Sequence, residues 1–283
     1  MGKFSFTKLV LAGLITVGVL GCGGNAGLAQ SQDISIEGDH GKLAATLQTP
    51  AGQEKYPLVI IMHGFTGNKD EALLTSLADD LEKEGIASLR FDFNGHGKSE
   101  GRFQDMTVPN EIEDAKHVYE YAKGLPGVTS VSLAGHSQGG VVASMTAGML
   151  GTDKVKSLAL MAPAAVLRED AIRGQIFDKH YDSLNPPATI DIFKGLKLGA
   201  GYVKAARDLP IYETAAQYQG PAFMIHGTGD VVVPYTYSLR YQRIYFQGQV
   251  KLVEGEDHGF SKNTKGATRA VADFFCEQLK SKF

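Results

Sequence analysis

The sequence predicts an α/β fold in which a mostly parallel, doubly wound sheet carries an inserted cap. From about residue 57 to the C-terminal end, short apolar runs alternate with stretches of helical periodicity, which is the order of successive βαβ units. One segment of about 48 residues, 163–210, breaks this alternation with mixed polarity, Pro186-Pro187 and several glycines. A connection of that length is usually functional, so we expect it to form a lid or substrate pocket above the C-terminal edge of the sheet.

The individual elements are predicted from local patterns. Residues 34–37 and 42–48 flank the turn signal Gly38-Asp39-His40-Gly41, which predicts an antiparallel hairpin at the sheet edge. Residues 58–62 form a continuous apolar run, typical of a strand covered on both faces. Apolar residues repeat at helical spacing from 73 to 81, and Gly85 is suited to end that helix. The remaining predicted elements are strands at 86–91, 128–134, 155–161, 221–225 and 250–253, and helices at 110–123, 141–150, 235–245 and 267–279.

Composition indicates an ordinary globular protein. Of the 283 residues, 43% are hydrophobic and 21% are charged, which is enough apolar material for a large core. No Pro/Ser-rich linker or block of charge divides the chain, so we expect a single domain with an insertion over residues 30–283. The net charge of -3 and the isoelectric point near 6.2 argue against a nucleic-acid partner, which would require a concentrated basic face.

The first 29 residues have the pattern of an export signal. Lys3 and Lys8 precede an apolar run over residues 9–20, which is shorter than the roughly 20 residues that a membrane span requires. Residues 19–22, VLGC, resemble a bacterial lipobox, in which Cys22 would be lipidated and anchor the chain to a membrane. A signal peptidase could instead cut after Ala29. Both alternatives predict an exported protein, either a cell-surface lipoprotein or a secreted or periplasmic one.

Only Cys276 remains in the folded part of the chain, so no internal disulfide is expected. It lies within an apolar-periodic stretch, which indicates a small core residue rather than a reactive thiol.

A nucleophile motif follows the predicted strand at 128–134. Residues 135–139, Gly-His-Ser-Gln-Gly, match the Gly-x-Ser-x-Gly pattern and precede a predicted helix. In the α/β-hydrolase fold this pattern forms a sharp strand-to-helix turn that exposes the serine, and side chains at Gly135 and Gly139 would clash with neighbouring elements. The sequence therefore predicts an α/β-hydrolase fold with Ser137 as its nucleophile.

A base and an acid are predicted at two later strand ends. A serine hydroxyl is a weak nucleophile unless a histidine takes its proton and an acid orients that histidine. The chain order in this fold is serine, acid, histidine, and the C-terminal ends of the strands are where such sheets bind ligands. Asp230 follows the strand at 221–225 and His258 follows the strand at 250–253, so we expect Ser137, Asp230 and His258 to form a catalytic triad.

Other polar residues near these positions are weaker candidates. Asp257 adjoins His258, but a neighbour in sequence rarely reaches the imidazole Nδ1 atom. His136 should face away from the serine, and His63 and His226 end strands, where we expect them to order loops by hydrogen bonding. No two histidines have the spacing of a metal site, so neither a metal nor another cofactor is expected.

The negative oxygen of a tetrahedral intermediate requires amide donors, each worth on the order of 10²–10³ in rate. One should be the N–H of Gln138, at the start of the helix. The second should come from the loop HGFTG at residues 63–67, where we expect the N–H of Phe65 to act.

These stretches together resemble the bacterial cinnamoyl (feruloyl) esterases of the α/β-hydrolase superfamily. The resemblance covers roughly residues 32–280 and is carried by HGFTGN at 63–68, RFDFNGHGKS at 90–99, GHSQGGVVAS at 135–144 and LPIYE at 209–213. It implies hydrolysis of esters between hydroxycinnamic acids, such as ferulate or p-coumarate, and plant-wall sugars or small alcohols. It also supports the triad and oxyanion residues named above.

The resemblance further implies that the cap binds the aromatic acid. In that family an acidic residue and a tyrosine from the cap bind the ring hydroxyl, and Asp170 and Tyr202 fall at the matching places. A phenolic OH can donate to a carboxylate while the ring fills an apolar pocket. We also expect a contact from Gln175, although it comes earlier than the family's bridging glutamine and Phe177 stands near the expected place.

The mechanism expected from these residues is a two-step acyl transfer through an acyl-enzyme on Ser137, with a small aromatic ester as the substrate. A general short-chain acyl esterase or monoglyceride lipase could use the same triad. A cell-surface binding lipoprotein built on an inactive hydrolase scaffold is a third, more remote alternative, which the intact order of serine, acid and histidine opposes.

Overall fold

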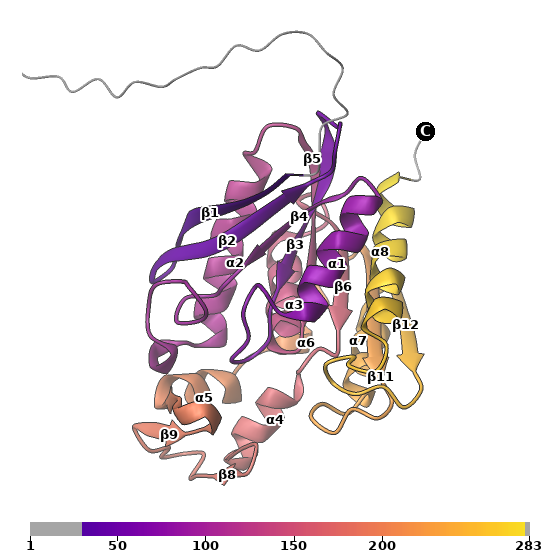
Figure 1. Cartoon of the computed structure of the whole chain (residues 1–283). Coiled ribbons are helices and arrows are strands. Elements are labelled where there is room, and N and C mark those ends of the chain that lie inside the picture. The colour runs from indigo at the N-terminus through magenta and orange to yellow at the C-terminus, as the bar shows by residue number, and fades with distance from the viewer. Residues whose placement is uncertain (1–29, 281–283) are drawn as a thin grey trace, which may run out of the picture.

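An eight-stranded sheet forms the centre of the computed structural model, which describes residues 30–280 (Figure 1). Its strand order is β1-β2-β4-β3-β5-β6-β11-β12. The first two strands pair antiparallel, β2 also pairs antiparallel with β4, and the remaining neighbours pair in parallel, which confirms the predicted edge hairpin and the mostly parallel sheet. The strands are β1 (Gln30–Gly38), β2 (Gly41–Thr49), β3 (Tyr56–Met62), β4 (Ala87–Phe91), β5 (Val128–His136), β6 (Val155–Met161), β11 (Pro221–Gly227) and β12 (Gln247–Val253).

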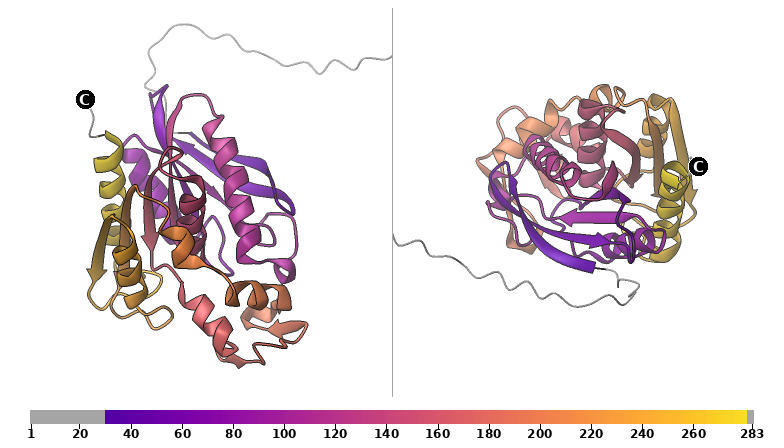
Figure 2. Two further views of the ribbon diagram at one scale, coloured as in Figure 1. Left: turned by 180° about the vertical axis from the view of Figure 1, so that it is seen from behind. Right: turned by 90° about the horizontal axis from the view of Figure 1, so that it is seen from above.

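Helices cover both faces of this sheet (Figure 2). On one face, α1 (Ala72–Lys83) packs against α8 (Thr264–Lys280). On the other face lie α2 (Val108–Lys123), α3 (Gln138–Leu150) and α7 (Thr236–Ile244). The sheet is therefore doubly wound, as the alternation of strands and helices predicts.

Strand β3 shows how alternate side chains of one strand are divided between the two faces of the sheet. All residues from Leu58 to Met62 are fully buried. Because side chains alternate along a strand, Leu58, Ile60 and Met62 join the core with α2 and α3, whereas Val59 and Ile61 join the core with α1 and α8. Each such side chain contributes roughly 1.5–3 kcal/mol through burial.

The segment at 163–210 forms a cap at the C-terminal ends of the parallel strands, below the sheet in Figure 1. Its helix α5 (Ala200–Arg207) is held by buried Tyr202 and Val203, which pack into the same core as α2 and α3. The return to the main body is made by α6 (Ile211–Ala215), which packs on α3. The cap elements are α4 (Val166–Arg173), β7 (Gln175–Ile176), β8 (Lys179–His180), β9 (Thr189–Asp191), η2 (Phe193–Gly195), β10 (Lys197–Gly199) and α5 (Ala200–Arg207).

A short 3-10 turn of the main body, η1 (Phe103–Asp105), anchors the cap on the side of α5. A Cβ atom at Gly199 would lie 2.3 Å from the carbonyl oxygen of Gln104, so the backbone of β10 approaches η1 more closely than any side chain would allow.

Cys276 differs from its expected place in the core. It is only partly buried on α8, and its thiol donates a hydrogen bond to the Glu84 carboxylate. Burial and this carboxylate raise the pKa of the thiol. Within residues 30–280, no helix combines the length and apolarity needed to cross a membrane. The expected signal segment, with Cys22 and Ala29, lies outside the described residues, so export and lipid anchoring stay predictions.

Candidate active site

Ser137 occupies a strained turn between β5 and α3. Its φ is 55° and its ψ is -122°, a conformation that residues other than glycine rarely adopt and that typically marks a functional position. A Cβ atom at Gly135 would lie 2.1 Å from the carbonyl oxygen of Gly139, and one at Gly139 would lie 2.3 Å from that of His63. Both glycines are therefore required by close backbone contacts, as the motif predicts.

The structure brings Ser137, His258 and Asp230 into one hydrogen-bonded row. Ser137 Oγ lies 2.9 Å from His258 Nε2, and His258 Nδ1 lies 2.7 Å from Asp230 Oδ2. An ionised carboxylate can only accept, so the Nδ1 atom carries the proton and Nε2 is left to accept from the serine hydroxyl. This arrangement can remove a proton from Ser137 as its oxygen attacks an electrophile.

Four donors hold the Asp230 carboxyl group, whose side chain is fully buried. Its Oδ1 atom accepts from the backbone N–H groups of Val232 and Val233, each at 2.8 Å, and its Oδ2 atom accepts from His258 and His226. Burial opposes ionisation, but the hydrogen bonds from His226 and His258 outweigh it and hold the pKa of Asp230 well below its usual value. The group is therefore a carboxylate at neutral pH.

His226 binds the Asp230 carboxylate directly, in addition to ordering the loop after β11. Its Nε2 atom lies 3.0 Å from Asp230 Oδ2 and 2.9 Å from the carbonyl oxygen of Val233, so it must carry the proton. Its Nδ1 atom accepts from the Ser238 hydroxyl at 2.7 Å. The available sequence signal was the short separation of the two residues, because His226 lies at the end of β11 and Asp230 lies in the loop that follows it.

The other candidates that adjoin the row have structural roles. Asp257 accepts hydrogen bonds from Ser261 and not from His258, as expected. His136 points away from Ser137, also as expected, and its Nε2 atom donates to the carbonyl oxygen of His258 at 2.9 Å. Burial lowers the pKa of His136 to about 4, so it supports the His258 loop as a neutral side chain.

The structure places Phe65 and Gln138, the residues expected to supply the oxyanion donors, beside the nucleophile. Gln138 begins α3, and the loop at 63–67 approaches Ser137 so closely that a Cβ atom at Gly64 would lie 2.9 Å from its Cβ atom. His63 orders this loop, as predicted: its Nδ1 atom donates to the carbonyl oxygen of Gly64, and its Nε2 atom accepts from the N–H of Phe93. Burial lowers the pKa of His63 to about 3, which keeps it neutral.

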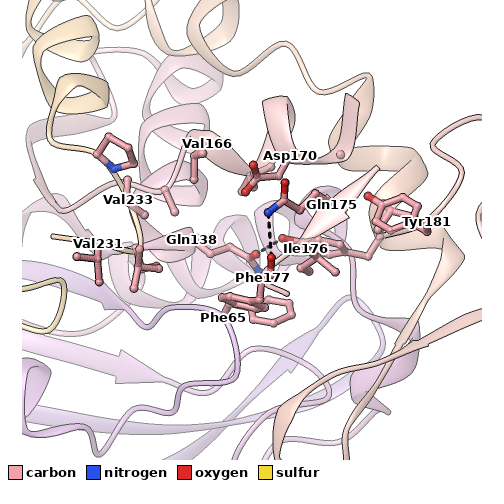
Figure 3. A pocket seen from close by; sticks show the side chains of 18 residues that line it. Phe65, Gln138, Val166, Asp170, Gln175, Ile176, Phe177, Tyr181, Val231 and Val233 are labelled. Carbon is pink, nitrogen blue, oxygen red and sulfur yellow. Dashed lines mark hydrogen bonds between the residues drawn. The ribbon is translucent and has the colours of Figure 1, made fainter. Parts of the chain in front are cut away.

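Ser137 and residues of the cap line a cavity of about 490 Å³, and Figure 3 shows the side chains around it. Its volume falls within the range of roughly 300–1,000 Å³ that is typical of small-molecule sites. Ser137, Phe65 and Gln138 line one side, and Asp170, Gln175 and Tyr202 of the cap also line it. The apolar part of the lining comes mainly from Ala164, Val166, Leu167, Ala171, Ile176, Val203, Val231, Val232, Val233 and Pro234.

The cap residues that were expected to bind the aromatic ring already form contacts within the protein. Asp170 pairs with Arg173 at 2.6 Å through its Oδ1 atom. The Nε2 atom of Gln175 donates to the carbonyl oxygen of Phe177 at 3.0 Å and so supports the turn between β7 and β8, where Phe177 has a φ of 50° (Figure 3). Gln175 thus lines the cavity as expected, but its amide donor serves the turn.

Gln138 is also the centre of a buried side-chain network. The Tyr202 hydroxyl donates to its Oε1 atom at 2.6 Å, and its Nε2 atom donates to Glu111 Oε2 at 2.8 Å. Glu111 is fully buried on α2, and its other oxygen has no hydrogen-bond partner within the described residues. Burial raises the pKa of Glu111 well above its usual value. The network fixes the side chain of Gln138 between the cap and the main body.

Replacing Glu111 with glutamine is expected to increase the free energy of unfolding, by an amount that grows with pH. A carboxyl whose pKa rises on folding binds more protons in the folded than in the unfolded state. Stability therefore falls by about 1.4 kcal/mol per pH unit, from the unfolded pKa of about 4.3 up to the folded pKa. Glutamine has no charge to bury and can still accept from Gln138. Chemical unfolding at pH 5 and pH 8 measures the difference.

Asp114 is a second buried acid whose effect on stability must be considered in that experiment. Burial raises its pKa to about 6, so the stability of the wild type has a second contribution of the same sign. Because Asp114 is present in both proteins, its contribution cancels in the comparison. A stability difference that is equal at the two pH values would contradict the role assigned to Glu111.

No three His, Cys, Asp or Glu side chains in residues 30–280 cluster in a way that could hold a metal ion.

The chain is similar to several known proteins. A family model described as serine aminopeptidase, S33 matches residues 53–187. The solved structure of Est1E from Butyrivibrio proteoclasticus with ferulic acid bound is 35% identical in sequence, with a TM-score of 0.84, and the match covers 87% of this chain and 98% of that one.

Two curated relatives match smaller parts. An uncharacterized 31.7 kDa protein of Escherichia coli is 32% identical over 100 residues, which is 35% of this chain and 35% of that protein. The lysophosphatidylserine lipase ABHD12 of Danio rerio is 27% identical over 186 residues, which is 65% of this chain and 46% of the lipase. The chain therefore spans less than half the length of either curated relative.

Proposed function

Since the chain belongs to the esterases of the α/β-hydrolase superfamily, we propose that it is a serine carboxylic-ester hydrolase acting on hydroxycinnamoyl esters, such as feruloyl and p-coumaroyl esters. The observation that carries ester hydrolysis is the continuous row from Ser137 through His258 to Asp230, which opens into a cavity large enough for an aromatic acid.

In the first step His258 accepts the hydroxyl proton of Ser137 while Oγ attacks the ester carbonyl carbon. Asp230 accepts the Nδ1–H hydrogen bond and stabilises the imidazolium that forms. The carbonyl oxygen becomes negative, and the N–H groups of Phe65 and Gln138 donate to it. His258 then returns the proton to the leaving alcohol, which departs and leaves the acyl group on Ser137.

In the second step water replaces the alcohol. His258 accepts a proton from the water molecule as its oxygen attacks the acyl carbon, and the same two N–H groups stabilise the second tetrahedral intermediate. The proton then moves to Ser137 Oγ, which restores the free enzyme and releases the carboxylic acid.

Three features support an aromatic acyl group. The cavity wall is mainly apolar, with Phe65 and Ile176 on it, and it carries the Asp170 carboxylate at the cap. An apolar ring with one phenolic hydroxyl matches such a lining. The similarity to a structure with ferulic acid bound extends over 87% of the chain.

A panel of ethyl esters tests this substrate class, because a shared alcohol keeps the leaving group constant. We expect kcat/KM for ethyl ferulate and ethyl p-coumarate to exceed that for ethyl butyrate and ethyl octanoate by at least roughly 10-fold, since apolar pockets discriminate by that factor or more for each misfit group. The similarity to a lysophosphatidylserine lipase makes the aliphatic esters the appropriate competitors. A preference for octanoate would contradict the proposal and favour a lipid substrate.

A further inference from the structure

The loop that follows Asp230 forms an entirely apolar side of the active-site cavity. We call residues 231–234, three valines and a proline, the valine loop, and all of them line the cavity. Figure 3 shows Val231 and Val233 at one end of the lining and Gln175 and Tyr181 of the cap at the other. Apart from Ser137, the polar side chains that line the cavity, among the residues that the structure describes, are Gln138 and the cap residues Asp170, Gln175, Tyr181 and Tyr202.

The valine loop is held in place by the catalytic acid. The Oδ1 atom of Asp230 accepts from the N–H groups of Val232 and Val233, each at 2.8 Å. His226 donates to the carbonyl oxygen of Val233 at 2.9 Å. Because these backbone groups are bonded within the protein, the loop has a fixed shape and presents mainly its apolar side chains to a ligand.

These side chains continue the cavity wall from the interior to the surface. Val233 is 1% exposed, Val232 is 47% exposed and Val231 is 95% exposed. Single apolar side chains are common on protein surfaces, but adjacent ones beside a ligand cavity are typical of a binding surface. A ligand that extends out of the cavity along this loop would cover apolar surface that the protein itself leaves open to water.

The geometry of the reaction places the alcohol part of the ester beside this loop. In the tetrahedral intermediate the negative oxygen lies toward the N–H groups of Phe65 and Gln138. The leaving oxygen must lie near His258 Nε2, which returns a proton to it. Asp230 connects His258 to the valine loop by direct hydrogen bonds. With the aromatic acid against the cap, the alcohol therefore extends toward residues 231–234.

We infer that the valine loop is the subsite for the alcohol part of the ester and that it selects alkyl alcohols over sugars and other polyols. An alkyl chain gains free energy when it leaves water for an apolar surface. The hydroxyl groups of a polyol lose water there without gaining a hydrogen bond from a side chain. This inference rests on the proposed function, because it assumes that the hydroxycinnamoyl group lies on the cap side of the cavity.

The first test keeps the feruloyl group constant and varies the alcohol. We expect kcat/KM to increase roughly 3- to 10-fold from methyl to butyl ferulate, because a fully buried methylene group is worth up to about 4-fold and the loop buries the chain only in part. The ester 1-feruloylglycerol has the carbon chain of propyl ferulate with added hydroxyl groups. Its kcat/KM should be roughly 3- to 10-fold lower than that of propyl ferulate.

The double variant Val231→Thr, Val232→Thr tests the loop itself. Threonine keeps the branched shape of valine and replaces a methyl group with a hydroxyl, and both positions are exposed enough for that hydroxyl to stay hydrated. We expect the butyl-to-methyl and propyl-to-glycerol ratios of kcat/KM to fall at least roughly 2-fold. The ratios cancel any change in the triad, because all of the esters react with Ser137 and His258.

Leu252→Thr is the matched control for the double variant. Leu252 is a 39% exposed apolar residue on β12 that does not line the cavity, so its replacement removes exposed apolar surface away from the site. Both ratios should stay at their wild-type values in this variant.

The outcomes separate the inference from the proposed function. A kcat/KM for 1-feruloylglycerol equal to or above that for propyl ferulate in the wild type would overturn the inference, while the activity on both esters would still support the function. Unchanged ratios in the double variant would also overturn it, because the alcohol would then lie elsewhere. Failure of the wild type to hydrolyse any ferulate ester would instead contradict the proposed function.

Discussion

Replacing Ser137 with alanine is expected to lower kcat/KM for ester hydrolysis by roughly 10⁴- to 10⁶-fold. The Oγ atom is the only hydroxyl in hydrogen-bond contact with His258 Nε2, among the contacts that the described residues make. Without it, no acyl-enzyme can form, and only substrate binding and the amide donors contribute to the residual rate. Initial rates on ethyl p-coumarate, at enzyme concentrations high enough to detect slow turnover, measure the loss.

Two controls make that result specific. The circular dichroism spectrum and Tm should stay close to those of the wild type. Alanine removes only one hydroxyl from the turn between β5 and α3, and the backbone strain at residue 137, where φ is 55°, is the same in both proteins. A fluorophosphonate probe should label the wild type and not the variant, since the label bonds to Oγ. Turnover close to wild type in the alanine variant would contradict the acyl-enzyme mechanism, and an unlabelled wild type would favour an inactive scaffold.

The reacting residues are predictable from the sequence because each depends on a local constraint. At Gly135 and Gly139 a Cβ atom would clash with nearby backbone atoms, so both positions must be glycine. The motif around Ser137 therefore predicts the sharp turn directly from the sequence. Asp230 and His258 lie on the loops that follow β11 and β12, two strands that pair in parallel. Parallel strands bring their C-terminal ends to one edge, so alternation of strands and helices is enough to bring the two side chains together.

The wall of the cavity is not predictable in the same way, because its contacts join positions that no local pattern relates. Tyr202 and Gln138 are 64 positions apart, and Gln138 and Glu111 are 27 apart. A resemblance can place Gln175 and Tyr202 in the cap, but it cannot show that their donors are already used within the protein.

The cap is the least predictable element for a related reason. Its segment mixes short hairpins with one- to two-turn helices, and such elements have little periodicity for a sequence to reveal. Their positions are set by tertiary contacts, such as the close approach of Gly199 to the backbone of η1 and the burial of Tyr202. Length and composition therefore indicate that a cap exists, and only the folded chain gives its shape.

Replacing Asp230 with asparagine is expected to lower kcat roughly 10⁴-fold, with little change in overall structure. The Oδ1 atom accepts from two backbone N–H groups, so the amide oxygen of asparagine must occupy that position. Its NH₂ group then replaces Oδ2 and donates toward His258 Nδ1. That donor favours the tautomer of His258 in which Nε2 carries the proton, and such a histidine cannot accept the proton of Ser137.

The same substitution also faces His226, whose Nε2–H would meet the new NH₂ group instead of a carboxylate oxygen. His226 keeps the Val233 carbonyl oxygen as an acceptor, but the N–H of the new amide group that faces His226 has no acceptor there. We therefore expect some loss of stability, on the order of 1–3 kcal/mol for that buried donor, which chemical unfolding measures separately from activity.

Asp257→Asn is the matched control for this change, because Asp257 adjoins His258 and accepts hydrogen bonds from Ser261. Its kcat should stay within a few-fold of the wild type. A large loss in Asp257→Asn together with near-normal activity in Asp230→Asn would reverse the assignment of the orienting acid, despite the 2.7 Å contact between Asp230 and His258.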